Sequence, residues 1–201
     1  MEIALTNVAK RFNYSWIFKE INLLLEQGST CAIIGHNGSG KSTLLQIISG
    51  VLTPSKGEIT FSLNGAKVEP YQHISIATPY IELIEEMTFK EIYEFQQAFK
   101  KFKLSFEECN SLFDFKGVKH KTINQYSSGM KQRLMLLLAV AADTKVLLLD
   151  EPTANFDEEG VEWYHNLIEK YTNNRTVVVS SNNKEEYKFC NEIIDITKFK
   201  S

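Results

Sequence analysis

The sequence predicts an α/β fold in which a mostly parallel sheet is joined by crossover helices. In the second half of the chain, short apolar stretches of strand type alternate with helical stretches, which is the pattern of βαβ units. A glycine-rich segment at 35–43 lies between an apolar strand and a helix, and another apolar strand ends in carboxylates at 150 and 151. Open α/β sheets bind ligands at the carboxyl ends of their strands, so these two segments are expected to lie close together.

Length and composition are those of one compact domain over 1–201. A chain of 201 residues can bury roughly 70% of its unfolded surface without disulfides or a structural metal. The net charge of −3 gives no general attraction to nucleic acid or anionic lipid, although a local patch can exist. Three scattered cysteines, without a CxxC pair, predict neither a disulfide framework nor a zinc site and fit a reducing compartment.

No membrane span or secretory signal is expected. The longest uncharged apolar run, 134–142, has nine residues, whereas a membrane helix needs about 20. The N-terminus has no basic stretch followed by an apolar one. These features predict a cytoplasmic protein.

The first half of the chain is dominated by strand patterns. Strands are predicted at 2–8, 16–26, 30–34, 57–63 and 74–77. A polar turn at 13–15 separates the first two strands, and a helix directly after 43 is expected to end at Gly50. In the second half, strands are predicted at 145–149, 176–180 and 193–196, with a helix at 161–171.

Between about 80 and 142 the periodicity is helical, so this segment is a candidate helical subdomain. Large apolar side chains recur there at helical spacing: Phe89, Ile92, Phe95, Phe99 and Phe102. The favoured interpretation is a buried helix face, and the alternative is a face that docks on a partner.

The glycine-rich segment has the pattern of a phosphate-binding loop. Its residues are Gly35, His36, Asn37, Gly38, Ser39, Gly40, Lys41, Ser42 and Thr43. Glycines let successive N–H groups turn inward around a phosphate at the start of a helix. Lys41 can then reach the β- and γ-phosphates, and the Ser42 hydroxyl can bind Mg²⁺.

The apolar strand that ends in Asp150 and Glu151 supplies two carboxylates at its carboxyl end. Because neighbouring residues of a strand point to opposite sides, the two carboxylates need different roles. Asp150 suits the outer sphere of Mg²⁺, and Glu151 suits polarising the water that attacks the γ-phosphate.

A third segment, Ser127, Ser128 and Gly129, opens the long apolar helix that follows. Ser127 is a good N-cap, and that role alone explains a serine at this position. A helix start with free N–H groups is also an anion site. A second phosphate-binding terminus far from the first is useful if it serves another subunit.

With these motifs in this order, the chain resembles the ATP-binding subunit of an ABC transporter over nearly its whole length. Residues 35–43 match Walker A, 127–129 match the signature, Asp150 and Glu151 match Walker B and the catalytic base, and 154–157 match the D-loop. Phe12 falls where the family places an aromatic ring on adenine, with packing in the core as the alternative. The resemblance implies a P-loop NTPase core, an N-terminal antiparallel β subdomain and a helical subdomain, which is the ABC ATPase fold.

The resemblance also implies cofactors and partners. ATP with Mg²⁺ would lie between Walker A of one subunit and the signature of another, in a head-to-tail dimer with a second copy or a related ATPase subunit. The dimer would dock on membrane-spanning transporter subunits at the cytoplasmic face of the inner membrane, through residues 80–112. Nucleic acid is not expected as a partner.

Two departures from the family pattern concern catalysis. The position of the Q-loop glutamine falls at about Pro79, and Asn182 stands where the family has its switch histidine. An asparagine donates an amide hydrogen bond to phosphate but cannot take up a proton. Losing one positioned donor costs about 10²- to 10³-fold in rate, so we expect a slow or partner-stimulated ATPase with Glu151 and Asn182 as catalytic residues.

Two other functions remain open from the sequence. One is a regulatory module that dimerises on ATP without hydrolysis, which Pro79 and Asn182 favour and Glu151 disfavours. The other is a soluble ABC-type ATPase that acts on nucleic acid or ribosomes, for which the basic aromatic stretch 99–103 is the local indication. The transported substrate and its direction depend on another chain.

Overall fold

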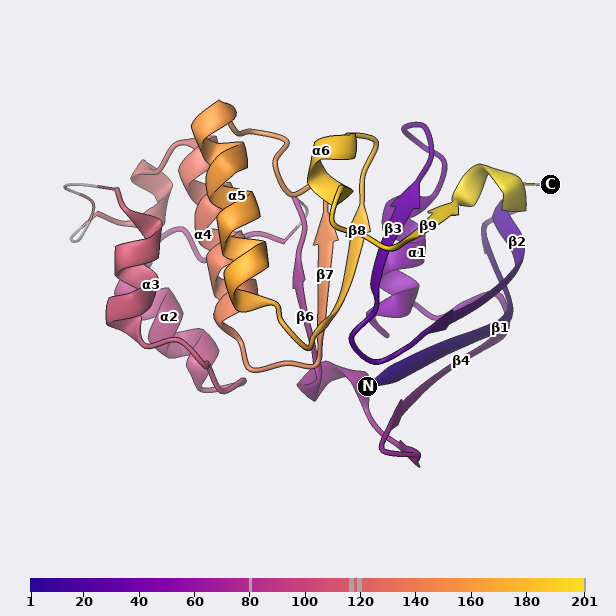
Figure 1. The fold of residues 1–201 in the computed structure, drawn as a ribbon. Coiled ribbons are helices and arrows are strands. Elements are labelled where there is room, and N and C mark those ends of the chain that lie inside the picture. The colour runs from indigo at the N-terminus through magenta and orange to yellow at the C-terminus, as the bar shows by residue number, and fades with distance from the viewer. Residues whose placement is uncertain (80, 116–117, 119–120, 201) are drawn as a thin grey trace.

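The computed structural model describes residues 1–79, 81–115, 118 and 121–200. Tyr80, where the predicted helical segment begins, and His120 lie outside the described residues. The described chain forms two β-sheets with helices packed beside them (Figure 1). None of its helices has the length and apolar character needed to cross a membrane.

An antiparallel sheet is formed by four strands from the N-terminal third of the chain. Its strands are β1 (Glu2–Phe12), β2 (Ser15–Leu25), β4 (Lys56–Leu63) and β5 (Ala66–Lys67), in the order β2-β1-β4-β5. The first two strands are confirmed, and β1 extends four residues beyond the predicted end because the hairpin closes at Asn13, which has a φ of 53°. Asparagine tolerates this left-handed conformation better than most residues.

The second sheet is parallel throughout and follows the order β6-β7-β8-β3-β9. Its strands are β6 (Ile74–Ala77), β7 (Val146–Asp150), β8 (Thr176–Ser180), β3 (Thr30–Ile34) and β9 (Glu192–Asp195). These positions confirm the predicted strands to within one or two residues. Because β7, β8 and β3 are neighbours, their carboxyl ends meet at one edge of the sheet.

The parallel sheet separates two apolar cores. On β7, Leu147 and Leu149 belong to one core, and Val146 and Leu148 belong to the other. The first core contains α4 (Ser128–Ala141) and α5 (Glu158–Tyr171), and the second contains α1 (Lys41–Ile48) and the antiparallel sheet. The strand that ends in Asp150 is therefore packed on both faces.

Helices α2 (Phe89–Gln97) and α3 (Phe106–Phe113) lie beside α4 at the far end of the molecule from the antiparallel sheet (Figure 1). Each begins with a reciprocal capping box, Thr88 with Glu91 and Ser105 with Glu108, which satisfies two of the free N–H groups at the start of the helix.

The predicted aromatic face of the helical segment is only partly buried. Phe89 and Ile92 lie in the core at 4% and 2% exposure, whereas Phe95 and Phe99 are 42% and 74% exposed. A spacing of three residues rotates each successive side chain 60° away from the preceding one on a helix of 3.6 residues per turn. In addition, α2 ends at Gln97, so one continuous buried face was the wrong prediction for Phe95 and Phe99.

A short irregular tail completes the chain. The last predicted strand ends at Asp195, and Ile196–Phe199 forms a 3-10 helix instead of continuing β9. The side chain of Asp195 caps this turn by accepting from the amide N of Thr197.

Candidate active site

The glycine-rich segment forms a tight loop between β3 and α1. Gly40 precedes α1 with a φ of 104°, and a Cβ there would lie 2.5 Å from Cγ2 of Ile17. Gly35 has a φ of 148°, and a Cβ there would lie 2.7 Å from Oγ of Ser39. Only glycine fits these two positions, because both conformations and both spaces exclude a side chain.

A cavity of about 360 Å³ opens beside this loop. It is lined by Ile17, Asn37, Gly38, Gly40, Lys41, Ser42, Thr43 and Glu151. The structure thus brings most of the predicted loop residues together with one of the two predicted carboxylates. The free N–H groups of the first helical turn and the positive end of the helix dipole make this a suitable site for a phosphate.

The predicted loop residues that do not line the cavity hold the loop together. The carbonyl of Gly35 accepts from Nζ of Lys41 at 2.9 Å, and the N–H of the fully buried Ser39 donates to the carbonyl of His36 at 3.0 Å. Nδ1 of His36 lies 2.9 Å from the carbonyl O of Asn37, and its Nε2 lies 3.3 Å from Nζ of Lys200. Since an ammonium group has three donors, Lys41 can keep its bond to the loop and still bind an anion.

Asp150 offers an oxygen that fits a hydrated metal ion. The side chain is 2% exposed, and Oδ1 has no hydrogen-bond partner among the described residues. Across the sheet it pairs in register with Ser180, whose Oγ is also buried without a partner in the described chain. Hard cations such as Mg²⁺ prefer carboxylate, hydroxyl and water oxygens, so Asp150 and Ser42 are a suitable donor set.

Glu151 has a strained backbone. Its φ is 44°, a left-handed conformation that costs a non-glycine residue about 1–3 kcal/mol. Two hydrogen bonds fix it: its N–H donates to the carbonyl of Ser180 at 2.9 Å, and its own carbonyl accepts from the amide N of Ala154 at 3.2 Å. The bend places Glu151 on the cavity beside the phosphate loop.

The segment after β8 reaches the same loop. The N–H of Ser181 donates to the carbonyl of Ile33 at 3.1 Å, and Nδ2 of Asn182 donates to Oδ1 of Asn37 at 2.9 Å. Asn182, predicted from its place after the strand, is therefore bonded to a residue that lines the cavity.

The segment Ser127–Gly129 lines a separate cavity of about 520 Å³. Ser127 caps α4, since its Oγ accepts from the amide N of Met130 at 3.2 Å. Asn155 and Phe156 line the same cavity, and a Cβ on Gly129 would lie 3.1 Å from the carbonyl O of Asn155. This cavity shares no lining residue with the one at the phosphate loop.

Phe12 lies at the exposed end of β1. Its side chain is 49% exposed, and Nζ of Lys10 lies 5.2 Å from the ring centroid. The alternative interpretation, a ring packed in the core, is therefore wrong.

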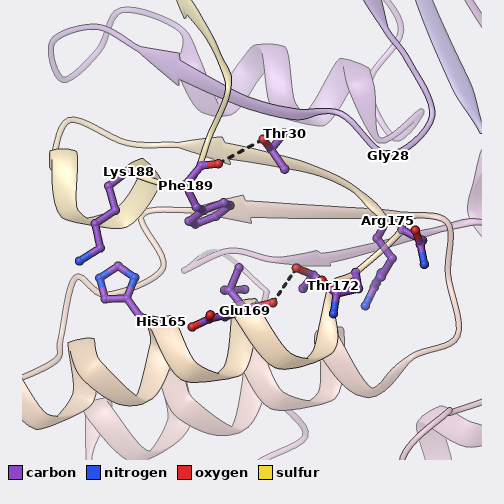
Figure 2. Close-up of a pocket in the computed structure, with 11 residues that line it drawn as sticks. Gly28, Thr30, His165, Glu169, Thr172, Arg175, Lys188 and Phe189 are labelled. Carbon is purple, nitrogen blue, oxygen red and sulfur yellow. Dashed lines mark hydrogen bonds between the residues drawn. The ribbon is translucent and has the colours of Figure 1, made fainter.

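Two further cavities include no residue of the phosphate loop. Pro79, the predicted position of the Q-loop, lines one of about 210 Å³ together with Ser128 and Gln132. Another, of about 450 Å³, lies between α5 and the segments that contain Thr30 and Phe189, and it includes none of the predicted site residues (Figure 2).

Two buried charged residues near the predicted site, Arg133 and Glu186, were not predicted from the sequence. The guanidinium carbon of Arg133 lies 4.9 Å from the ring centroids of Phe115 and Trp163 and 5.8 Å from that of Phe156. Its position just before the apolar run of α4 was the one sequence feature that could have indicated its burial.

Glu186, on the short helix α6 (Lys184–Tyr187), is 3% exposed. Nothing in its sequence context distinguishes it from Glu185.

Comparisons with known proteins agree with this geometry. A model of the ABC transporter family matches residues 18–154. The sulfate/thiosulfate import ATP-binding protein CysA of Mesostigma viride is 31% identical over 96% of this chain, which spans 59% of that protein. The ABC transporter ATP-binding protein YybJ of Bacillus subtilis is 30% identical over 92% of this chain and 87% of its own length.

Among solved structures, a dimeric ATP-binding cassette bound to ADP and Pi shares the fold. Its TM-score is 0.81 at 24% identity, and the superposition covers 97% of this chain and 95% of the cassette. The phosphate loop, the carboxylate pair and the family match all lead to one assignment. The chain therefore belongs to the ABC transporter family and is a nucleotide-binding domain of that family.

Proposed function

We propose that this chain hydrolyses ATP, with Mg²⁺, at the interface of a head-to-tail dimer. The observation that carries the proposal is the separation of the two cavities. Lys41, Ser42 and Glu151 line one of them, and Ser127–Gly129 line the other. Because the two cavities share no lining residue, the second phosphate-binding segment is free to serve the nucleotide of another subunit, either a second copy or a related ATPase.

In this proposal the loop residues bind the nucleotide. The phosphates lie against the N–H groups of 38–43, with the Lys41 ammonium at the β- and γ-phosphates. Ser42 and Asp150 hold Mg²⁺, which neutralises phosphate charge when it is bound. The exposed ring of Phe12 stacks on adenine, a use that its 49% exposure permits.

Glu151 and Asn182 act on the reacting end of the nucleotide. Glu151 lines the cavity and orients the attacking water as a general base. Asn182 can donate from Nδ2 to the γ-phosphate, but its amide cannot carry a proton or a charge. The proposed ATPase is therefore slow, or accelerated by a partner.

The exposed aromatic residues of the helical region are the proposed docking surface for a membrane-spanning transporter subunit. The rings of Phe95 and Phe99 contact each other with centroids 5.1 Å apart and remain exposed. Phe99 also lines a largely apolar groove of about 240 Å³ with Ile81 and Phe102. Exposed apolar surface of this kind favours a protein partner. Docking there would place the chain at the cytoplasmic face of the inner membrane, and no nucleic acid is proposed as a partner.

ATP turnover over a range of protein concentrations tests the proposal, with Glu151→Gln as the matched variant. We expect turnover to rise more than linearly with protein concentration, because the composite site needs two chains, and to disappear in Glu151→Gln. Thermal shift with ATP measures binding separately.

The same experiment decides the second candidate, a regulatory domain that binds ATP without hydrolysis, which Asn182 favours. Saturable ATP binding without turnover, also in the presence of the membrane-spanning partner, would support that candidate. Absence of ATP binding would contradict both.

A further inference from the structure

Glu186 has an unusual environment for a carboxylate. Its Oε1 accepts from Thr153 twice, from the backbone N at 2.9 Å and from Oγ1 at 2.5 Å. Its Oε2 is buried without a hydrogen-bond partner among the described residues. Among those residues the ion pairs are Lys90–Glu94, Lys131–Glu85 and Lys188–Glu185, so Glu186 has no paired cation there.

Stability alone does not explain a buried acidic side chain at this position. A buried carboxyl group is tolerated when its hydrogen bonds compensate for lost hydration, and an apolar residue of similar size is often as stable. Here the compensation is incomplete, because one oxygen has no partner. Thr153 is itself 6% exposed, so the contact lies in the interior.

The contact joins two segments of the proposed active site. Thr153 lies in the turn that starts at Glu151, which the bond from the amide N of Ala154 to the carbonyl of Glu151 closes. Thr153 is also the residue directly before the D-loop, 154–157. A displacement of Thr153 would therefore move both the strained Glu151 and the start of the D-loop.

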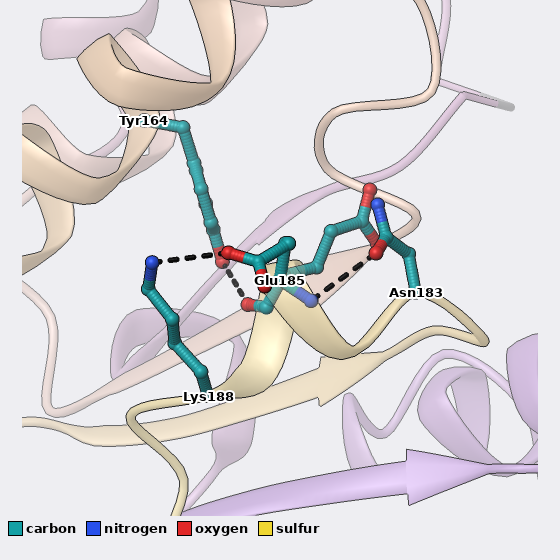
Figure 3. A network of polar contacts seen from close by, with 5 residues as sticks. Tyr164, Asn183, Glu185 and Lys188 are labelled. Carbon is teal, nitrogen blue, oxygen red and sulfur yellow. Dashed lines mark hydrogen bonds and ion pairs between the residues drawn. The ribbon is translucent and has the colours of Figure 1, made fainter. Parts of the chain in front are cut away.

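On its other side, Glu186 is tied to the segment of Asn182. The N–H of Glu186 donates to the carbonyl of Asn183 at 3.0 Å, and the carbonyl of Glu186 accepts from the Tyr164 hydroxyl at 2.8 Å. Burial raises the pKa of the Tyr164 hydroxyl well above its ordinary value, so this donor keeps its proton. Figure 3 shows the Tyr164 ring above the turn that Asn183 opens.

We infer that Glu186 is a positioning residue that couples the segment of Asn182 to the turn of Glu151. Asn182 is bonded to Asn37 in the phosphate loop, and Glu186, four residues later, holds Thr153. A shift of the Asn182 segment on nucleotide binding is thereby passed to Glu151 and to the D-loop. The inference rests on the proposed ATPase function and adds a residue that does not touch the nucleotide.

Three variants test it. Glu186→Met keeps the size of the side chain but removes the acceptor, so Thr153 loses both bonds. Glu186→Gln retains a carbonyl oxygen that can accept from Thr153. Glu185→Met is the matched control, because Glu185 lies next to it on α6 but is exposed and paired with Lys188.

We expect Glu186→Met to lower kcat about tenfold or more with KM for ATP within about threefold, since misplaced catalytic groups affect the chemical step more than binding. Glu186→Gln should retain at least about a third of wild-type kcat and Glu185→Met nearly all of it. A kcat of Glu186→Met within twofold of wild type would overturn the inference. Equal losses of kcat and ATP binding in both Glu186 variants would also overturn it, because they would indicate a purely structural role.

Hydrogen exchange supplies a measurement that does not need turnover. In the wild type, ATP should change the exchange of amides in 151–157 as well as in the phosphate loop. In Glu186→Met, the change at 151–157 should disappear while that at 36–43 remains. Should the wild type bind ATP without hydrolysis, the proposed function fails and this comparison alone decides the inference. An unchanged response at 151–157 in Glu186→Met would contradict it.

Discussion

The side-chain amides of Asn182 and Asn37 are bonded at 2.9 Å and join the loop after β8 to the phosphate loop. We predict that Asn182→His raises kcat, by up to about 10²-fold, because an imidazole at this position can donate to the γ-phosphate as a cation. Steady-state turnover from pH 5.5 to 8.5 checks this. The variant should lose its advantage above the pKa of the new imidazole, whereas the wild type should show no such limb. A variant no faster than the wild type at any pH would contradict the prediction.

Arg133 should contribute strongly to the stability of the helical region, because its guanidinium contacts three aromatic rings and the residue is only 9% exposed. We predict that Arg133→Met lowers the free energy of unfolding by about 1–3 kcal/mol. Lys131→Met on the same helix removes a partly exposed partner of Glu85 and should change the free energy of unfolding by less than about 1 kcal/mol. Urea titration measures both, and equal effects would contradict the role of the rings.

The three thiols should be inert in the native protein. Burial raises the pKa values of Cys31, Cys109 and Cys190 to about 12, and the thiolate is the form that reacts with iodoacetamide. We expect no labelling at pH 8 in the native state and labelling of all three thiols in urea. Native labelling at any of them would contradict this.

The same shift gives stability a defined pH dependence. Because the folded thiols bind their protons more tightly than the unfolded ones, their contribution is fully present below the unfolded pKa near 9. It is then lost progressively as the pH rises from there toward 12, since the unfolded thiols release their protons first. Thermal unfolding of a variant with all three cysteines replaced by alanine or serine should show a smaller decline of Tm with pH in this range.

Phe95 and Phe99 should matter for docking and not for folding. We predict that Phe95→Ser with Phe99→Ser changes the free energy of unfolding by less than about 1 kcal/mol, because both side chains are exposed. The double variant should lose co-sedimentation with membranes that contain the partner subunit. Tyr14→Ser is the matched control, since Tyr14 is 96% exposed in the β1–β2 turn, far from α2 along the chain. Equal loss in the control would contradict a specific docking surface.

The sequence predicted the elements whose signals are local. The glycine-rich loop and the two apolar strands that end just before Glu151 and Ser181 each have a recognisable sequence pattern. The strands, and the edge of the sheet at which their carboxyl ends meet, could therefore be predicted. The φ of 44° at Glu151 could not be derived, because it results from bonds to Ser180 and Ala154 that exist only once β7 and β8 are paired. The burial of Glu186 could not be derived for the same reason, because its hydrogen-bond donor, Thr153, is 33 residues away in the sequence. The exposure of Phe99 could not be derived either, because it depends on where α2 ends.

The position of β3 in the sheet bears on how the protein is made. Its partners are β8 and β9, so Thr30 is matched with Val177 and Cys31 with Glu192. A ribosome must therefore add more than 140 residues after β3 before either neighbour is available. Until then β3 has no strand to pair with, and the phosphate loop that follows it is not held in position. Nascent chains that lack residues beyond about 175 are expected to need chaperone protection and to be unable to bind ATP, which makes the last strands the step that commits the chain to its ligand.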